Sequence, residues 1–196
     1  MNKSADKTKK RRDLPSKNAG RIRPVWISRS PEETRSCGEA LGRRLTGGEM
    51  IALEGNLGAG KTHLIQGMAR GLGVTDPTVT SPTFVYLHEF RGRHPLAHVD
   101  LFRIEREADL FDLGLFEYLD GPWVVAIEWA DKAGGALPAE RLTIRLTQQD
   151  ETTRRIEFEA TGERYQALLS AFTQRARRAR GGGSGGLASG GGDASP

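Results

Sequence analysis

The middle of the chain alternates short apolar runs with stretches in which apolar residues recur at helical spacing. The apolar runs predict strands over residues 25–28, 50–53, 85–90, 96–100 and 123–127. Alternation of apolar and polar residues predicts two further strands, 141–147 and 153–160, which we expect to pair antiparallel. Helices are predicted from residue 31 to about 45, from 61 to about 72, over 107–119 with a break near Gly114, and over 163–180.

Local signals mark the ends of the first two helices. Ser30 precedes Pro31 and a glutamate at position 33, the order of an N-cap, a proline in the first turn and a capping box. A Gly-Gly pair at 47–48 is expected to end this helix, and Gly73 is expected to end the next one. Helices interleaved with short buried strands predict a three-layer α/β sandwich. The sheet is expected to be mixed and mainly parallel, with the antiparallel hairpin near the C-terminus.

The charge is unevenly distributed along the 196 residues, whose formal net charge is +4. Residues 1–23 hold nine Lys/Arg against two Asp, and residues 181–196 are mostly Gly and Ser. We expect both ends to be disordered, the first as a basic tail and the second as a Gly/Ser tail. The domain between them is predicted over 24–180, and residues 24–172 hold 16 Lys/Arg against 22 Asp/Glu, so a basic face for nucleic acid is not indicated.

Several classes of protein are excluded by composition. No window approaches 18 uncharged apolar residues, and no apolar stretch follows the basic N-terminus, so neither a membrane span nor a secretory signal is predicted. Cys37 is the single cysteine, which excludes an internal disulfide, and no Cys/His cluster has zinc spacing. The expected protein is cytoplasmic and has no membrane partner.

A phosphate-binding motif is the strongest chemical signal. Residues 55–62, GNLGAGKT, fit G-x-x-x-x-G-K-[ST] at every fixed position, with a predicted strand before them and a helix after them. Glycines let the main-chain amides approach a phosphate chain, and the helix N-terminus favours the anion. Lys61 would add positive charge at the β- and γ-phosphates, and the Thr62 hydroxyl is placed to ligate Mg²⁺. No guanine-reading N-K-x-D lies in the domain, so ATP is the expected nucleotide.

The residues leave the second metal ligand open. Asp100 and Glu128 both end predicted buried strands, and either carboxylate suits Mg²⁺. The hydroxyl-rich segment 80–84 reads by default as a turn before a strand, although such a loop can also move onto a γ-phosphate. His98 reads by default as a structural histidine, with catalysis as the minority interpretation. Trp129 is by default a packing residue, although an aromatic side chain beside a metal carboxylate can also rest on a nucleotide or a partner.

The order of several segments resembles one family. LEGNLGAGKTHLIQGMARGLG (53–73), TSPTF (80–84), LAHVDLFRI (96–104), DLGLFEYL (112–119) and VVAIEW (124–129) together look like TsaE, a small bacterial ATPase. TsaE proteins are required for threonylcarbamoyladenosine at position 37 of tRNAs that read codons beginning with A. The resemblance covers about residues 26–160, and Phe102 stands where the family more often has Tyr.

The resemblance implies a set of site residues. Mg²⁺ would be held by Thr62 and Glu128, with Lys61, Thr83, Asp100 and Glu128 as catalytic residues and Thr83 as a switch-like element. The segment 31–34 would approach the adenine. ATP would be bound by the phosphate loop and by a tryptophan after the last buried strand, that is by Gly55, Leu57, Gly58, Ala59, Gly60, Lys61, Thr62 and Trp129.

The resemblance also implies partners. The protein would bind the TsaD and TsaB heterodimer, would reach tRNA only through that complex, and would reset it by ATP binding and hydrolysis. Hydrolysis by the lone chain is expected to be slow, because a closing partner usually supplies water exclusion and extra charge. The alternatives are a phosphate-loop small-molecule kinase, which would pass phosphate to a metabolite, and a non-catalytic scaffold ordered by ATP.

Overall fold

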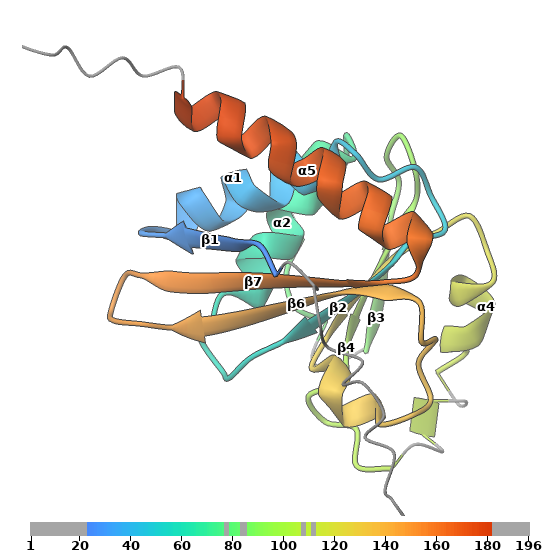
Figure 1. Cartoon of the computed structure of the whole chain (residues 1–196). Coiled ribbons are helices and arrows are strands. Elements are labelled where there is room, and N and C mark those ends of the chain that lie inside the picture. The colour runs from blue at the N-terminus through green and yellow to red at the C-terminus, as the bar shows by residue number, and fades with distance from the viewer. Residues whose placement is uncertain (1–22, 77–78, 83–85, 107–108, 111–112, 182–196) are drawn as a thin grey trace, which may run out of the picture.

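The computed structural model describes residues 23–76, 79–82, 86–106, 109–110 and 113–181, with side chains described as far as residue 174. Seven strands form one sheet in the order β1-β7-β6-β2-β5-β4-β3 (Figure 1). The strands are β1 (Val25–Ser28), β2 (Met50–Glu54), β3 (Leu87–Phe90), β4 (Leu96–Asp100), β5 (Val124–Glu128), β6 (Arg141–Gln148) and β7 (Arg154–Thr161). The helices are α1 (Pro31–Gly42), α2 (Lys61–Gly71), α4 (Leu115–Leu119) and α5 (Glu163–Gly181), with a 3-10 turn η1 (Ala130–Ala133).

The sheet is parallel in its centre and antiparallel at both sides. β6, β2, β5 and β4 run parallel, and β2, β4 and β5 are almost wholly buried because both faces of the sheet are covered. β6 and β7 form the predicted antiparallel hairpin, β1 pairs with β7, and β3 pairs with β4. The predicted α/β class with a mixed sheet is therefore confirmed.

Two apolar clusters cover the two faces of the sheet and make the three layers. α1, α2 and α5 cover one face, with a core that includes Leu41, Leu64 and Phe172. Figure 1 shows α1 and α5 on the same side of the sheet. The opposite face is covered by the segment after β4, by α4 and by η1, through Leu101, Leu115 and Ala133. No helix within the described part of the chain is long and apolar enough to cross a membrane.

The first helix starts as predicted but ends early. The Ser30 hydroxyl accepts a hydrogen bond from the Glu33 amide at 3.1 Å, and Pro31 occupies the first turn. The helix ends at Gly42 and not near residue 45, so the glycines at 47–48 do not stop it. Arg93, from the turn between β3 and β4, donates to the carbonyls of Gly42 and Leu45 at 3.2 and 3.0 Å. This distant guanidinium satisfies carbonyl groups that the helix end leaves open.

Two other boundaries differ from the prediction. The strand predicted over 85–90 begins at Leu87, because Tyr86 has a φ of 63° and its amide donates to the Pro82 carbonyl at 2.7 Å. The break near Gly114 is confirmed, since this glycine has a φ of 64° and α4 begins after it. Residues 1–22 and 182–196, in which the two disordered tails are predicted, lie outside the described residues.

Candidate nucleotide and metal site

The phosphate motif forms the loop between β2 and α2. Gly55, Gly58 and Gly60 have φ values of 145°, 78° and 100°, which are backbone conformations that residues other than glycine rarely adopt. A Cβ on Gly55 would lie 2.4 Å from the Leu146 carbonyl oxygen, so the loop packs directly on the main chain of β6. Gly60 provides no side-chain cap, which leaves the first amides of α2 open to an anion.

Lys61 lies across this loop. Its side chain is 4% exposed, and its Nζ donates to the carbonyl oxygens of Gly55 and Asn56 at 2.7 and 3.1 Å. The same nitrogen lies 3.8 Å from the centre of the Trp129 ring, a cation–π distance. Burial lowers the pKa of Lys61, and three nearby carboxylates, among them Glu128, partly oppose this shift. The cation is therefore held over the loop by main-chain oxygens, an aromatic face and acidic neighbours.

Thr62 and Glu128 meet at the start of α2. The Thr62 hydroxyl donates to Oε1 of Glu128 at 2.7 Å, although the two residues are 66 positions apart. Glu128 ends β5, is 3% exposed, and also contacts Nε2 of His98 at 3.0 Å through the same oxygen. The two residues proposed by resemblance to hold Mg²⁺ are thus in direct contact.

Asp100 lies beside Glu128 but has different partners. The two carboxylates are paired in register at the ends of β4 and β5. Asp100 accepts hydrogen bonds from the Ser81 hydroxyl and, at 2.8 Å, from the Phe102 amide. The two carboxylates therefore differ in position, since Glu128 contacts Thr62 whereas Asp100 contacts Ser81 and the Phe102 amide.

Trp129 joins this site from the turn after β5. Its φ of 58° places the residue in the left-handed region, and its ring packs on Phe102 with centroids 5.1 Å apart. Of the other predicted loop residues, Ala59 is buried and Leu57 is 79% exposed. Thr83, the predicted switch-like residue, lies outside the described residues, as does the rest of 83–85.

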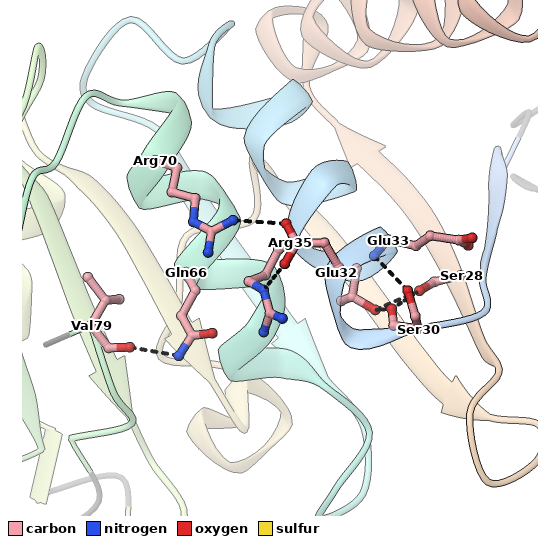
Figure 2. A network of polar contacts seen from close by, with 9 residues as sticks. Ser28, Ser30, Glu32, Glu33, Arg35, Gln66, Arg70 and Val79 are labelled. Atoms are coloured by element: carbon pink, nitrogen blue, oxygen red, sulfur yellow. Dashed lines mark hydrogen bonds and ion pairs between the residues drawn. The ribbon is translucent and has the colours of Figure 1, made fainter. Parts of the chain in front are cut away.

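The segment before Thr83 contacts α2. The Gln66 side-chain amide donates to the Val79 carbonyl at 2.9 Å (Figure 2). Nearby, Glu32 on α1 accepts from Arg35 at 2.7 Å and from Arg70 on α2 at 3.0 Å, which ties the two helices together and lowers the pKa of Glu32. These contacts link α2 to α1 and to the 79–82 segment.

The sequence reading missed two contributors to the site. Arg154, at the start of β7, reaches the Gly58 carbonyl at 3.4 Å, and nothing in its local sequence indicated this contact. Gln66 was read only as part of a helix. Of the segment 31–34, buried Thr34 lies near the loop, since its methyl carbon would lie 3.8 Å from a Cβ on Gly60.

The residues present fit a magnesium ion that is bound together with a nucleotide. Thr62 and Glu128 offer a hydroxyl and a carboxylate oxygen, the ligand types that Mg²⁺ prefers. Within the described residues no group of three or more His, Cys, Asp or Glu side chains is placed to hold a metal alone. Phosphate oxygens and water would therefore have to complete the coordination, as is usual for Mg²⁺ in nucleotide sites.

Comparisons with known proteins agree with one another. The family model described as "Threonylcarbamoyl adenosine biosynthesis protein TsaE" matches residues 28–156. The chain is 42% identical over 150 residues to the tRNA threonylcarbamoyladenosine biosynthesis protein TsaE of Bacillus subtilis, a match that covers 76% of this chain and 93% of the relative. It is 44% identical over 132 residues to the protein of that name from a Nostoc species, a match that covers 65% of this chain and 80% of that relative. The crystal structure of YdiB from Bacillus subtilis is similar with a TM-score of 0.69 at 33% identity, covering 80% of this chain and 97% of that one.

Proposed function

The chain belongs to the TsaE family and has that family's role in tRNA threonylcarbamoyladenosine biosynthesis, and we propose that it acts there as a Mg²⁺-dependent ATPase. The observation that carries the proposal is the 2.7 Å contact between Thr62 and Glu128 at the mouth of the phosphate loop. A phosphate loop alone would bind many nucleotides. The added carboxylate supplies what metal-assisted hydrolysis needs.

The proposed chemistry divides among a few groups. Loop amides and the N-terminus of α2 bind the phosphates, and Lys61 exchanges its contacts with Gly55 and Asn56 for phosphate oxygens. Mg²⁺ would neutralise charge on the β- and γ-phosphates when bound at Thr62 and Glu128. Trp129, whose ring faces the Lys61 ammonium, would pack beside the nucleotide and keep water from Lys61. Thr83 would act as a switch-like element on the γ-phosphate side.

We place this activity in the cytoplasm, in a complex with the TsaD and TsaB heterodimer, which the chain would reset through ATP binding and hydrolysis. Contact with tRNA would be indirect, through that complex. Asp100 would be a second acidic residue beside the metal position. Its hydrogen bond with Ser81 joins the site to the segment that leads to Thr83. Hydrolysis by the isolated chain would be slow, since the exposed loop residue Leu57 leaves this side open to solvent.

Phosphate release tests the proposal. The chain is assayed with ATP and Mg²⁺, alone and with TsaB and TsaD, as wild type and as Lys61→Ala, Glu128→Ala and Asp100→Asn. Glu128→Ala should abolish Mg²⁺-dependent release and leave the fold intact, whereas Glu117→Gln, an exposed carboxylate on α4, is the matched control and should behave as wild type.

Three results would count against the proposal. Wild-type turnover in Glu128→Ala would move the metal role to Asp100. Turnover that TsaB and TsaD do not raise would contradict the partner role. Radiolabel that passes from ATP to a metabolite, and not to free phosphate, would favour a small-molecule kinase instead.

A further inference from the structure

His98 is buried on a central strand of the sheet, next to the proposed metal ligand Glu128. It is in the middle of β4, is 0% exposed, and is paired in register with Ala126 of β5. Because side chains alternate along a strand, the residue two positions after Ala126 projects from the same face as His98. That residue is Glu128, which explains how two side chains from neighbouring strands meet under α2.

A single carboxylate oxygen of Glu128, Oε1, accepts both hydrogen bonds that this side chain receives from the described residues. Nε2 of His98 lies 3.0 Å from Oε1, and the Thr62 hydroxyl lies 2.7 Å from the same atom. An ionised carboxylate can only accept, so in this contact the Nε2 atom carries the hydrogen. Within the described chain Oε2 receives no hydrogen bond, so it is the oxygen left for a metal ion or a metal-bound water.

The other nitrogen of His98 argues against a role in packing alone. Nδ1 is the one buried side-chain nitrogen or oxygen in the described residues that has no hydrogen-bond partner. Leaving a buried polar atom unpaired costs about 1–3 kcal/mol. An apolar side chain that only filled this space would avoid that penalty, so the imidazole is explained by its Nε2–H and not by its volume.

We infer that His98 is a positioning residue for Glu128. Its Nε2–H would hold the carboxylate with Oε1 toward Thr62, which leaves Oε2 for the metal ion. The inference deepens the proposed function and rests on it. Side chains that orient a metal ligand through one hydrogen bond typically change metal affinity 10–100-fold when they are replaced. His98 itself touches neither nucleotide nor metal in this arrangement.

Metal affinity measured by Mn²⁺ titration tests the inference. Free and bound Mn²⁺ are distinguished by electron paramagnetic resonance on the full-length, ATP-loaded chain, for wild type and for His98→Gln, His98→Asn and His98→Leu. The Gln amide nitrogen can take the place of Nε2, whereas the Asn amide is one methylene too short and Leu has no donor. ATP affinity in EDTA and the thermal midpoint are measured in parallel as readouts that a metal-positioning role does not change.

We expect His98→Asn and His98→Leu to weaken Mn²⁺ binding by about 10–100-fold, with ATP affinity in EDTA unchanged, and His98→Gln to restore most of the loss. Equal Mn²⁺ affinity in all four proteins would overturn the inference, and so would an equal loss in Gln, Asn and Leu. If Asn and Leu do not fold, the Gln variant decides, because a large loss there also overturns it. A wild-type chain that binds no Mn²⁺ with ATP would contradict the proposed function itself, which the variants do not test.

Discussion

Glycines make the contact between α1 and α2, the helix that carries the phosphate loop. A Cβ added to Gly67 of α2 would lie 1.9 Å from the carbonyl oxygen of Arg35 on α1. On the other helix, a Cβ on Gly38 would lie 2.1 Å from the carbonyl oxygen of Leu64. Main chain therefore packs on main chain at this crossing, and no side-chain rotation can make room for a methyl group.

The substitution Gly67→Ala should accordingly destabilise the protein. An ordinary Cβ contact begins at 3.4 Å, so the helices would have to separate by about 1.5 Å at this point. Overpacking of this kind costs about 1–3 kcal/mol. Replacing a helical glycine by alanine gains roughly 0.5–1 kcal/mol, so the clash outweighs the gain. The net loss is then about 0.5–2 kcal/mol, so for a domain of this size we expect the melting temperature to fall by roughly 1–8 °C, at about 2–4 °C per kcal/mol.

Urea denaturation followed by far-ultraviolet circular dichroism measures the change, with ATP binding as a second readout because α2 carries Lys61 and Thr62. Gly135→Ala is the matched control, since a Cβ there meets no atom within 4 Å and its φ is not positive. The control should keep wild-type stability or gain slightly. A Gly67→Ala protein as stable as wild type would refute the close main-chain contact between α1 and α2.

Three further predictions concern single polar groups. Tyr165→Phe removes the hydroxyl that accepts from the buried Met50 amide at 2.8 Å, so the free energy of unfolding should drop by about 1–3 kcal/mol in urea, and an unchanged value would contradict this. Burial and nearby arginines lower the pKa of His63 below 6.5, so below that pH the unfolded chain binds more protons and stability falls on acidification. His63→Gln should flatten that fall in parallel melts, and identical pH slopes would be contrary evidence. Thr62→Val should lose Mg²⁺-dependent ATP affinity in calorimetry whereas Thr62→Ser keeps it, and equal affinities would show that the hydroxyl bonded to Glu128 is not needed.

The predictions that hold are those that depend on neighbouring residues. Alternation in β6 and β7, the cap at Ser30 and the phosphate loop are all local patterns, and each lies where it was expected. The differences come from distant residues. α1 ends at Gly42, where Arg93, fifty-one positions away, donates to the Gly42 carbonyl, and no local signal near Gly42 indicates that contact.

Positions within the site follow the same division. The sequence indicated that Asp100 and Glu128 end buried strands, but their roles depend on which strand lies beside α2 and on the register between β4 and β5. Register brings His98 into contact with Glu128, so a histidine that the sequence analysis interpreted as structural becomes a neighbour of the proposed metal position. Strand order and register are set by packing across the whole sheet, which a pattern within one segment does not contain.

The pairing of β4 with β5 also couples the two sides of the site. Glu128 contacts the phosphate-loop helix through Thr62, whereas Asp100 contacts Ser81, on the segment that precedes Thr83. Between the two carboxylates, the Leu101 amide donates to the Glu128 carbonyl at 3.1 Å, so both are fixed to one rigid pair of strands. Moving the 79–82 segment away from the site would break the part-buried hydrogen bond between Ser81 and Asp100, so this segment and the phosphate-loop helix are linked through one pair of strands.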